Sequence, residues 1–161
     1  MKNSTKFFAA AATAVALFFT TNASAQKLGV GLNLGVPTID GYNFAIGADA
    51  RLQFDVSKQV SIPVTAGYTH FLGKDNVSDF GYIPLKSGVK IFFDESGSGL
   101  YGLGEIGAAF GVTNSSGFSF LYSPAIGYSW SNGLDLGVKY EGFSKGDVGQ
   151  VALRVAYGFK L

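Results

Sequence analysis

The sequence of 161 residues contains no cysteine, one histidine and few charged residues. Without cysteine the chain has no disulfide, no lipid anchor on a cysteine and no thiol nucleophile, and a Cys/His zinc site is excluded as well. Charged residues make up 14% of the chain, whereas ordinary soluble domains contain roughly 25%. So few charges do not suit a protein that is surrounded by water on all sides.

Long apolar runs are also missing, because the run over residues 7–19 is shorter than the about 20 residues that a membrane-spanning helix needs. This run follows two lysines and precedes the small residues at positions 22–25. A basic start, a short apolar stretch and a small-residue site are typical of a cleaved signal peptide. We therefore predict a signal peptide over residues 1–25, export of the mature chain, and a single barrel domain over residues 26–161.

Removal of the leader takes away two of the 12 basic residues and none of the 11 acidic ones, so the mature chain has a net charge of −1. A nucleic-acid partner is not expected, because it would require a basic surface. The remaining 21 charged residues follow a pattern when residues 26–161 are divided into eight alternating strands. Twelve lie on the glycine-rich face, nine lie in turns, and none shares the face that carries the large apolar residues.

Bulky apolar residues alternate with small or polar ones, with a period of two, through almost all of the mature chain. The predicted strands cover residues 27–36, 44–55, 60–69, 83–93, 100–112, 118–130, 134–141 and 150–161. Pro63, Pro84 and Pro124 fall inside these ranges. Because proline lacks the N–H that a sheet ladder uses, we expect bulges or strand ends at these positions.

Side-chain volume indicates which face points inward. An eight-stranded barrel has an interior just wide enough for side chains to fill, so the glycine-rich face fits inside and the bulky face does not. A charge-free outer face requires lipid, and a closed barrel leaves no backbone group unpaired there. The predicted fold class is an all-β, eight-stranded antiparallel up-and-down transmembrane β-barrel, with outer-membrane lipid as its surroundings.

Aromatic residues gather near both ends of the predicted strands, as in the two girdles of transmembrane barrels. One girdle would contain Phe44, Tyr68, Phe110, Phe118 and Phe120, and the other Phe54, Phe93, Tyr128, Trp130, Tyr157 and Phe159. The connections over 37–43 and 72–80 are longer and more polar than those after the second, fourth and sixth strands. We expect the longer connections to face the outside and the tight turns to face the periplasm.

Three segments carry a family resemblance: Tyr82-Ile83-Pro84-Leu85-Lys86-Ser87-Gly88-Val89-Lys90, Tyr101-Gly102-Leu103-Gly104 and the ending Arg154-Val155-Ala156-Tyr157-Gly158-Phe159-Lys160-Leu161. With the leader and the eight strands, they resemble the small outer-membrane β-barrel family. The resemblance is strongest to porin-family or OmpX-like barrels of Gram-negative bacteria, Bacteroidetes among them. The resemblance implies that the barrel-assembly machinery reads Tyr157, Phe159 and Leu161, although the family usually ends on an aromatic residue.

Nine charged residues are predicted to share the lumen: Asp49, Arg51, Lys86, Lys90, Glu105, Asp135, Lys139, Glu141 and Arg154. In a narrow and poorly hydrated interior such charges must pair or lose their charge, so an ion-pair network that plugs the barrel is the preferred interpretation. The alternative is a narrow channel or carrier for ions or small apolar solutes, in which rings of charge select the solute.

Signals for catalysis are weak. His70 precedes a polar segment with Asp75, Ser78 and Asp79, so a Ser-His-Asp arrangement in a lipid-modifying barrel enzyme is a third possibility. An interfacial histidine beside a solvated loop is the preferred interpretation, and the two aspartates lack the dense spacing of a calcium loop. We therefore predict a monomeric, non-enzymatic protein without a cofactor or metal, whose rigid scaffold presents loops for a structural or surface-interaction role.

Overall fold

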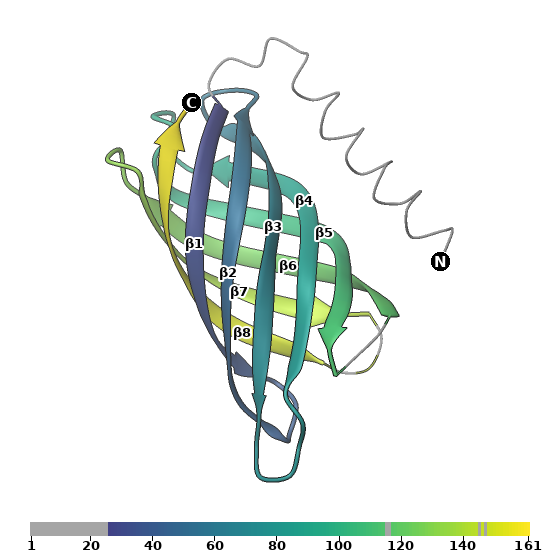
Figure 1. The fold of residues 1–161 in the computed structure, drawn as a ribbon. Helices are drawn as coiled ribbons and strands as arrows, with labels where there is room; N and C mark the ends of the chain where they lie inside the picture. The colour runs from purple at the N-terminus through teal and green to yellow at the C-terminus, as the bar shows by residue number, and fades with distance from the viewer. Residues whose placement is uncertain (1–25, 115–116, 145, 147) are drawn as a thin grey trace.

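The computed structural model describes residues 26–161 except 115, 116, 145 and 147. They form eight strands that close into one antiparallel barrel in chain order, with β1 pairing with both β2 and β8 (Figure 1). The strands are β1 (Gln26–Pro37), β2 (Tyr42–Asp55), β3 (Val60–Gly73), β4 (Phe80–Phe92), β5 (Gly99–Thr113), β6 (Gly117–Ser129), β7 (Leu134–Phe143) and β8 (Gly149–Lys160). The predicted all-β up-and-down barrel is confirmed. The predicted signal peptide over residues 1–25 lies outside the described residues.

The alternation of side chains separates an apolar outside from a polar inside. On β5, Glu105 is buried in the lumen, whereas the next residue, Ile106, is 61% exposed on the outside. The same pattern recurs on every strand. Exposed apolar side chains include Leu32, Ile46, Tyr68, Val89, Ile106, Ile126, Val138 and Leu153, one from each strand in turn. Within the part of the chain that the structure describes, no helix is long and apolar enough to cross a membrane.

The two ends of the barrel differ in what they carry. The turn end holds the connections over 56–59, 93–98 and 130–133 and the outer ends of β1 and β8, and the loop end holds the connections after β1, β3, β5 and β7. The expected long connection at 37–43 is wrong, because only 38–41 lie between the strands. Gly41 has a φ of 96° and so permits this tight reversal. The β3–β4 hairpin instead projects beyond the barrel (Figure 1).

Pro63, Pro84 and Pro124 lie within strands, and not at strand ends. The β3–β4 ladder has gaps at Pro63 and Pro84, and the β6–β7 ladder has a gap at Pro124. The neighbouring strand on the other side pairs through each proline without a gap. Each proline therefore interrupts one of its two ladders, as the missing N–H requires. At the first gap the Ser87 hydroxyl donates to the Pro63 carbonyl over 2.9 Å.

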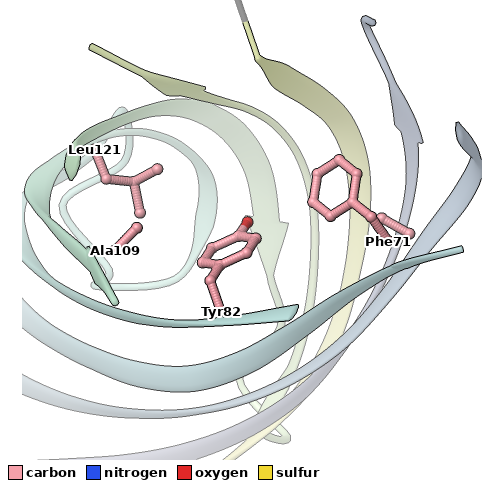
Figure 2. Packing of buried hydrophobic residues seen from close by; sticks show 5 residues of the cluster. Phe71, Tyr82, Ala109 and Leu121 are labelled. Atoms are coloured by element: carbon pink, nitrogen blue, oxygen red, sulfur yellow. The ribbon is translucent and has the colours of Figure 1, made fainter. Parts of the chain in front are cut away.

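Rings and small apolar side chains line the lumen near the loop end. This group, here called the aromatic cluster, consists of buried Ala45, Phe71, Tyr82, Ala109 and Leu121, with partly buried Tyr42, Phe80 and Phe143 packed against them. Figure 2 shows Phe71, Tyr82 and Leu121 projecting into the space that the strands enclose. A smaller group near the turn end contains Phe92, Tyr101 and Leu103. The core of the protein is thus inside the barrel.

Candidate functional site

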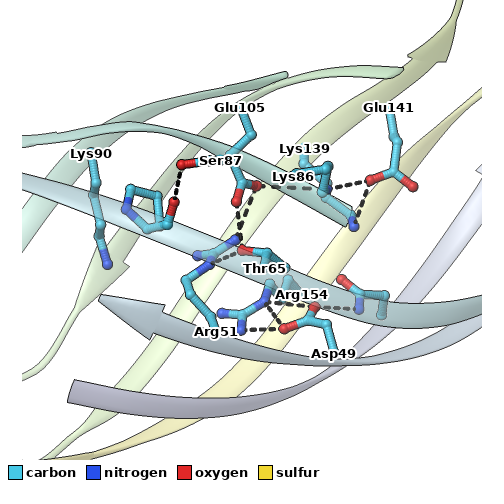
Figure 3. Close-up of polar contacts among 12 residues, drawn as sticks. Asp49, Arg51, Thr65, Lys86, Ser87, Lys90, Glu105, Lys139, Glu141 and Arg154 are labelled. Carbon is cyan, nitrogen blue, oxygen red and sulfur yellow. Dashed lines mark hydrogen bonds and ion pairs between the residues drawn. The ribbon is translucent and has the colours of Figure 1, made fainter. Parts of the chain in front are cut away.

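Five charged side chains from four strands meet in the middle of the lumen, and we call them the central network. Glu141 on β7 is 0% exposed and lies 2.5 Å from the Lys86 Nζ on β4 and 3.2 Å from the Lys139 Nζ. Glu105 on β5 lies 3.2 Å from the Arg51 Nη2 on β2 and 3.6 Å from the Lys86 Nζ. Lys86 therefore links the two glutamates (Figure 3).

Neutral side chains complete the hydrogen bonds of both glutamates. The Thr65 hydroxyl donates to Glu105 over 2.6 Å and accepts from the Arg51 Nε. The Tyr82 hydroxyl donates to Glu141, and the Gln150 amide donates to the same carboxylate over 3.3 Å. Buried charges are tolerated when such partners are present. Thr65, Tyr82 and Gln150 were not among the predicted site residues, although each is a polar residue at an inward-facing position.

A second group of four charged residues, called the turn-side network, includes Lys90 and Asp135, which lie toward the turn end. The Arg154 Nη2 on β8 lies 2.6 Å from the Asp49 Oδ1 on β2, and the Lys90 Nζ on β4 lies 2.8 Å from the Asp135 Oδ2 on β7. Arg154 also approaches Asp135 at 3.5 Å. The Tyr101 hydroxyl donates to Asp135, and the Lys90 Nζ lies 3.8 Å from the centre of the Tyr101 ring.

The structure therefore places all nine predicted lumen residues inside the barrel and divides them between the two networks. Each has an oppositely charged partner within 3.2 Å. Four of these pairs join strands that are not neighbours, as when Arg51 on β2 meets Glu105 on β5, whereas Lys139 and Glu141 both belong to β7. Such cross-lumen pairs can tie opposite walls of the barrel together and obstruct the passage between its ends.

Two cavities lie on opposite sides of the central network. The turn-side vestibule has a volume of about 530 Å³ and reaches Arg51, Lys90, Asp135 and Arg154 from the turn end. The loop-side cavity has a volume of about 400 Å³ and is lined by members of the aromatic cluster and by residues of the loop end. The two cavities share no lining residue among those that the structure describes. Of the described residues that line the loop-side cavity, none is charged.

His70 lies at the loop end of β3, outside the lumen. Its Nε2 is 3.1 Å from the Asp79 Oδ2, and its Nδ1 is 3.0 Å from the Tyr68 hydroxyl. The Gly73 N–H, which donates to Asp79, and the His70 ring hold the pKa of the Asp79 carboxyl below its ordinary value. Because both ring nitrogens have these partners, the considered arrangement with Ser78 is not formed. Among the described residues, no group of three or more potential ligands is placed to hold a metal ion.

The predicted aromatic girdles lie mostly on the outside. At the loop end Phe44, Tyr68, Phe118 and Phe120 are exposed and Phe110 is half-buried, and at the turn end Phe93, Tyr128, Trp130, Tyr157 and Phe159 are exposed. Phe54 is different, since it is 8% exposed and so adds nothing to an exposed band. It stands opposite Ile62 on β3, and this bulky neighbour is itself partly covered. Tyr157, Phe159 and Leu161, predicted to guide assembly, all face outward.

No family model matches the sequence, and no curated protein matches it either. Similar solved structures include Ail, the attachment invasion locus protein of Yersinia pestis, with a TM-score of 0.62 and 15% identity over 85% of this chain and 98% of that chain. The N-terminal β-barrel domain of Pseudomonas aeruginosa OprF has a TM-score of 0.59 and 13% identity, over 84% of this chain and 100% of that chain. Neisserial surface protein A has a TM-score of 0.56 and 15% identity, over 86% of this chain and 99% of that chain. The expected fold of small outer-membrane β-barrels is confirmed.

Proposed function

We propose that this protein is an outer-membrane β-barrel with a structural or surface-interaction role and a lumen that ion pairs close. The observation that carries the proposal is the pairing of all nine lumen charges within 3.2 Å. A conducting pore needs polar groups that are free to replace the hydration shell of a passing solute. Here those groups bind one another, which favours a closed barrel over the narrow channel or carrier.

The apolar outside supports a location in lipid. Side chains such as Leu32 at 66% exposed and Val138 at 47% exposed would make unfavourable contact with water. Outer-membrane lipid is the proposed partner of this surface, and the barrel-assembly machinery is the proposed reader of the final residues of β8. Because the closed barrel leaves no free sheet edge for another copy to pair with, we propose a monomer.

A surface role is supported by contacts that hold the loop end together. The Lys74 N–H donates to the Gly41 carbonyl over 2.8 Å and thereby joins the connections after β3 and β1. The Asn114 amide donates to the Asp79 carbonyl over 2.9 Å, which joins the connections after β5 and β3. A rigid scaffold that presents connected loops is a common basis for recognition.

Single-channel recording of the refolded protein in a planar bilayer tests the closed lumen. We expect wild type to conduct little. In a urea titration of the refolded protein, we expect Glu105→Ala to lower the free energy of unfolding by about 3–5 kcal/mol, since Arg51 loses its buried partner. The matched control is Glu95→Ala, which removes an exposed carboxylate from the connection at 93–98. A stable Glu105→Ala protein with altered conductance or ion preference would instead support the channel.

Fractionation tests the location. A closed barrel stays folded in mild detergent, so we expect unboiled and boiled protein to migrate differently on a gel and the protein to separate with the outer membrane. In lipid vesicles, Val138→Arg should destabilise the barrel by about 2–4 kcal/mol because the charge would lie in hydrocarbon, with Val138→Leu as the control. Recovery as a soluble periplasmic protein would reject the membrane assignment.

A further inference from the structure

The loop-side cavity is lined by none of the nine paired lumen charges, so the closed lumen does not explain it. Its volume of about 400 Å³ falls in the range of pockets that hold small organic ligands. Its lining combines residues from inside the barrel with Ile39 and Val148 from the loop-end connections. The cavity is therefore an inner pocket that adjoins the loop end.

The walls of the cavity differ in size. One side carries the rings of Tyr42, Phe80, Tyr82 and Phe143 from β2, β4 and β7. These rings are already ordered, since the Tyr82 and Phe143 centroids are 4.9 Å apart in an edge-on arrangement. The other side, on β5 and β6, carries the small residues Ala109, Gly111, Gly117 and Ser119, with Phe118 between the last two. Rings that face small residues leave room for one more flat group.

The charge of the lining restricts the ligand. None of the described lining residues is charged, so these residues offer an ionic ligand no partner of opposite charge. The Tyr82 hydroxyl already donates to Glu141 and accepts from the Gln150 amide over 3.1 Å. The cavity thus favours a neutral molecule that contacts rings through its own apolar surface.

We propose that the loop-side cavity binds a small uncharged aromatic molecule that enters from the loop end. Aromatic rings attract one another edge-on or offset at centroid distances of about 4.5–7 Å, which an added ring can reach here. A lipid chain is not the proposed occupant, because β5 and β6 pair without a gap across the small wall, at Ala109–Ser119 and Gly111–Gly117. The central network separates the cavity from the turn-side vestibule.

The test uses indole, a neutral aromatic probe that dissolves in water. Isotope-labelled barrel in nanodiscs is titrated with indole, and empty nanodiscs report the partition of indole into lipid. We expect saturable amide shifts at Ala109, Gly111 and Ser119, and weak or no shifts with the anionic analogue indole-3-acetate. Ser119→Leu should fill the space and weaken binding about tenfold or more. Ala108→Leu, on the outward side of the same wall, is the matched control and should bind as wild type.

Three results would overturn the proposal. Shifts that grow linearly with indole and appear equally at outward residues such as Ile106 would indicate partition into the bilayer only. Unchanged affinity in Ser119→Leu, or equal binding of indole-3-acetate, would contradict the pocket or its neutral character. Nuclear Overhauser effects between lipid chains and Ser119 would assign the cavity to lipid. If Ser119→Leu does not refold, Gly111→Leu places a side chain in the same space. The proposal does not depend on the structural or surface role, since a conducting barrel could bind indole equally.

Discussion

The two halves of the barrel interior carry different kinds of side chain, charged in one half and aromatic in the other, although the same strands build both. On β4, Lys90 and Lys86 face the lumen toward the turn end and in the middle, and Tyr82 faces it toward the loop end. The turn-side vestibule is bordered by charged side chains, whereas none of the described residues that line the loop-side cavity is charged. One row of inward positions thus changes from ionic to aromatic within a single strand.

A narrow lumen can therefore be closed in two ways, which respond differently to substitution. In the charged half, each side chain depends on the identity of its partner, because removing one member leaves the other buried and unpaired. In the aromatic half, side chains depend on shape, because removing a ring leaves a cavity. Tyr82 belongs to both, since its ring packs against Phe143 and its hydroxyl donates to Glu141.

The largest expected effect is that of Glu141→Ala, which breaks the charged half at its most buried point. The change leaves Lys139 without the partner at 3.2 Å and Lys86 with only Glu105 at 3.6 Å. We expect a loss of about 3–5 kcal/mol in the free energy of unfolding. Urea titration of vesicle-refolded protein, followed by the fluorescence of the single tryptophan, Trp130, measures it. A loss below about 1 kcal/mol would mean that the lumen is hydrated and behaves like an exposed surface.

An intermediate effect is expected for Tyr82→Phe, which cuts the link between the halves and keeps the ring. Glu141 loses a donor and the Gln150 amide loses an acceptor, so we expect a cost of about 1–3 kcal/mol in the same titration. The control is Tyr42→Phe, which also keeps a ring in the aromatic cluster. In a Glu141→Ala background the effect of Tyr82→Phe should shrink, because coupled residues are not additive. Full additivity would show that the two halves are energetically independent.

Strand alternation made most of the fold predictable. The period of two predicts that Glu105 and Ile106 face opposite sides, because successive side chains of a strand point to opposite faces of the sheet. The pairing of charges was not predictable, since Arg51 meets Glu105 across the lumen and not on a neighbouring strand. Which residues meet there depends on the tilt and stagger of the closed barrel. The register shift between Gly81 and Tyr82 likewise has no signal in the alternation of residues.

The aromatic cluster was missed for a different reason. Volume suggested that bulky residues face outward, yet Phe71, Tyr82 and Leu121 are bulky and inward. The period of two does contain the signal, because Phe71 continues the inward row of Thr69 and Leu121 that of Ser123. A rule that assigns every bulky residue to the outside fails here, because the inward side chains are bulky near the loop end and charged elsewhere.

The smallest expected effect concerns the rim of the loop end, where Asp79 accepts from the Gly73 N–H and pairs with His70. The Gly73 N–H and His70 lower the pKa of Asp79 in the folded protein. The stabilisation is therefore complete above the ordinary carboxyl pKa of about 3.9 and is lost as the pH falls through the lower folded value. We expect no measurable change in the urea midpoint from Asp79→Asn, because the group is exposed.

The local consequence can be followed at the Gly73 amide by NMR between pH 7 and pH 2. In wild type its shift should follow the titration of Asp79, in Asp79→Asn that response should be absent, and in both proteins the Phe71 amide should stay unchanged. Phe71 is 0% exposed within the aromatic cluster, so its packing does not require the rim carboxylate. If the Phe71 amide moves together with Gly73, the loop-side half depends on charge as well as shape, and the contrast between the two halves of the lumen is lost.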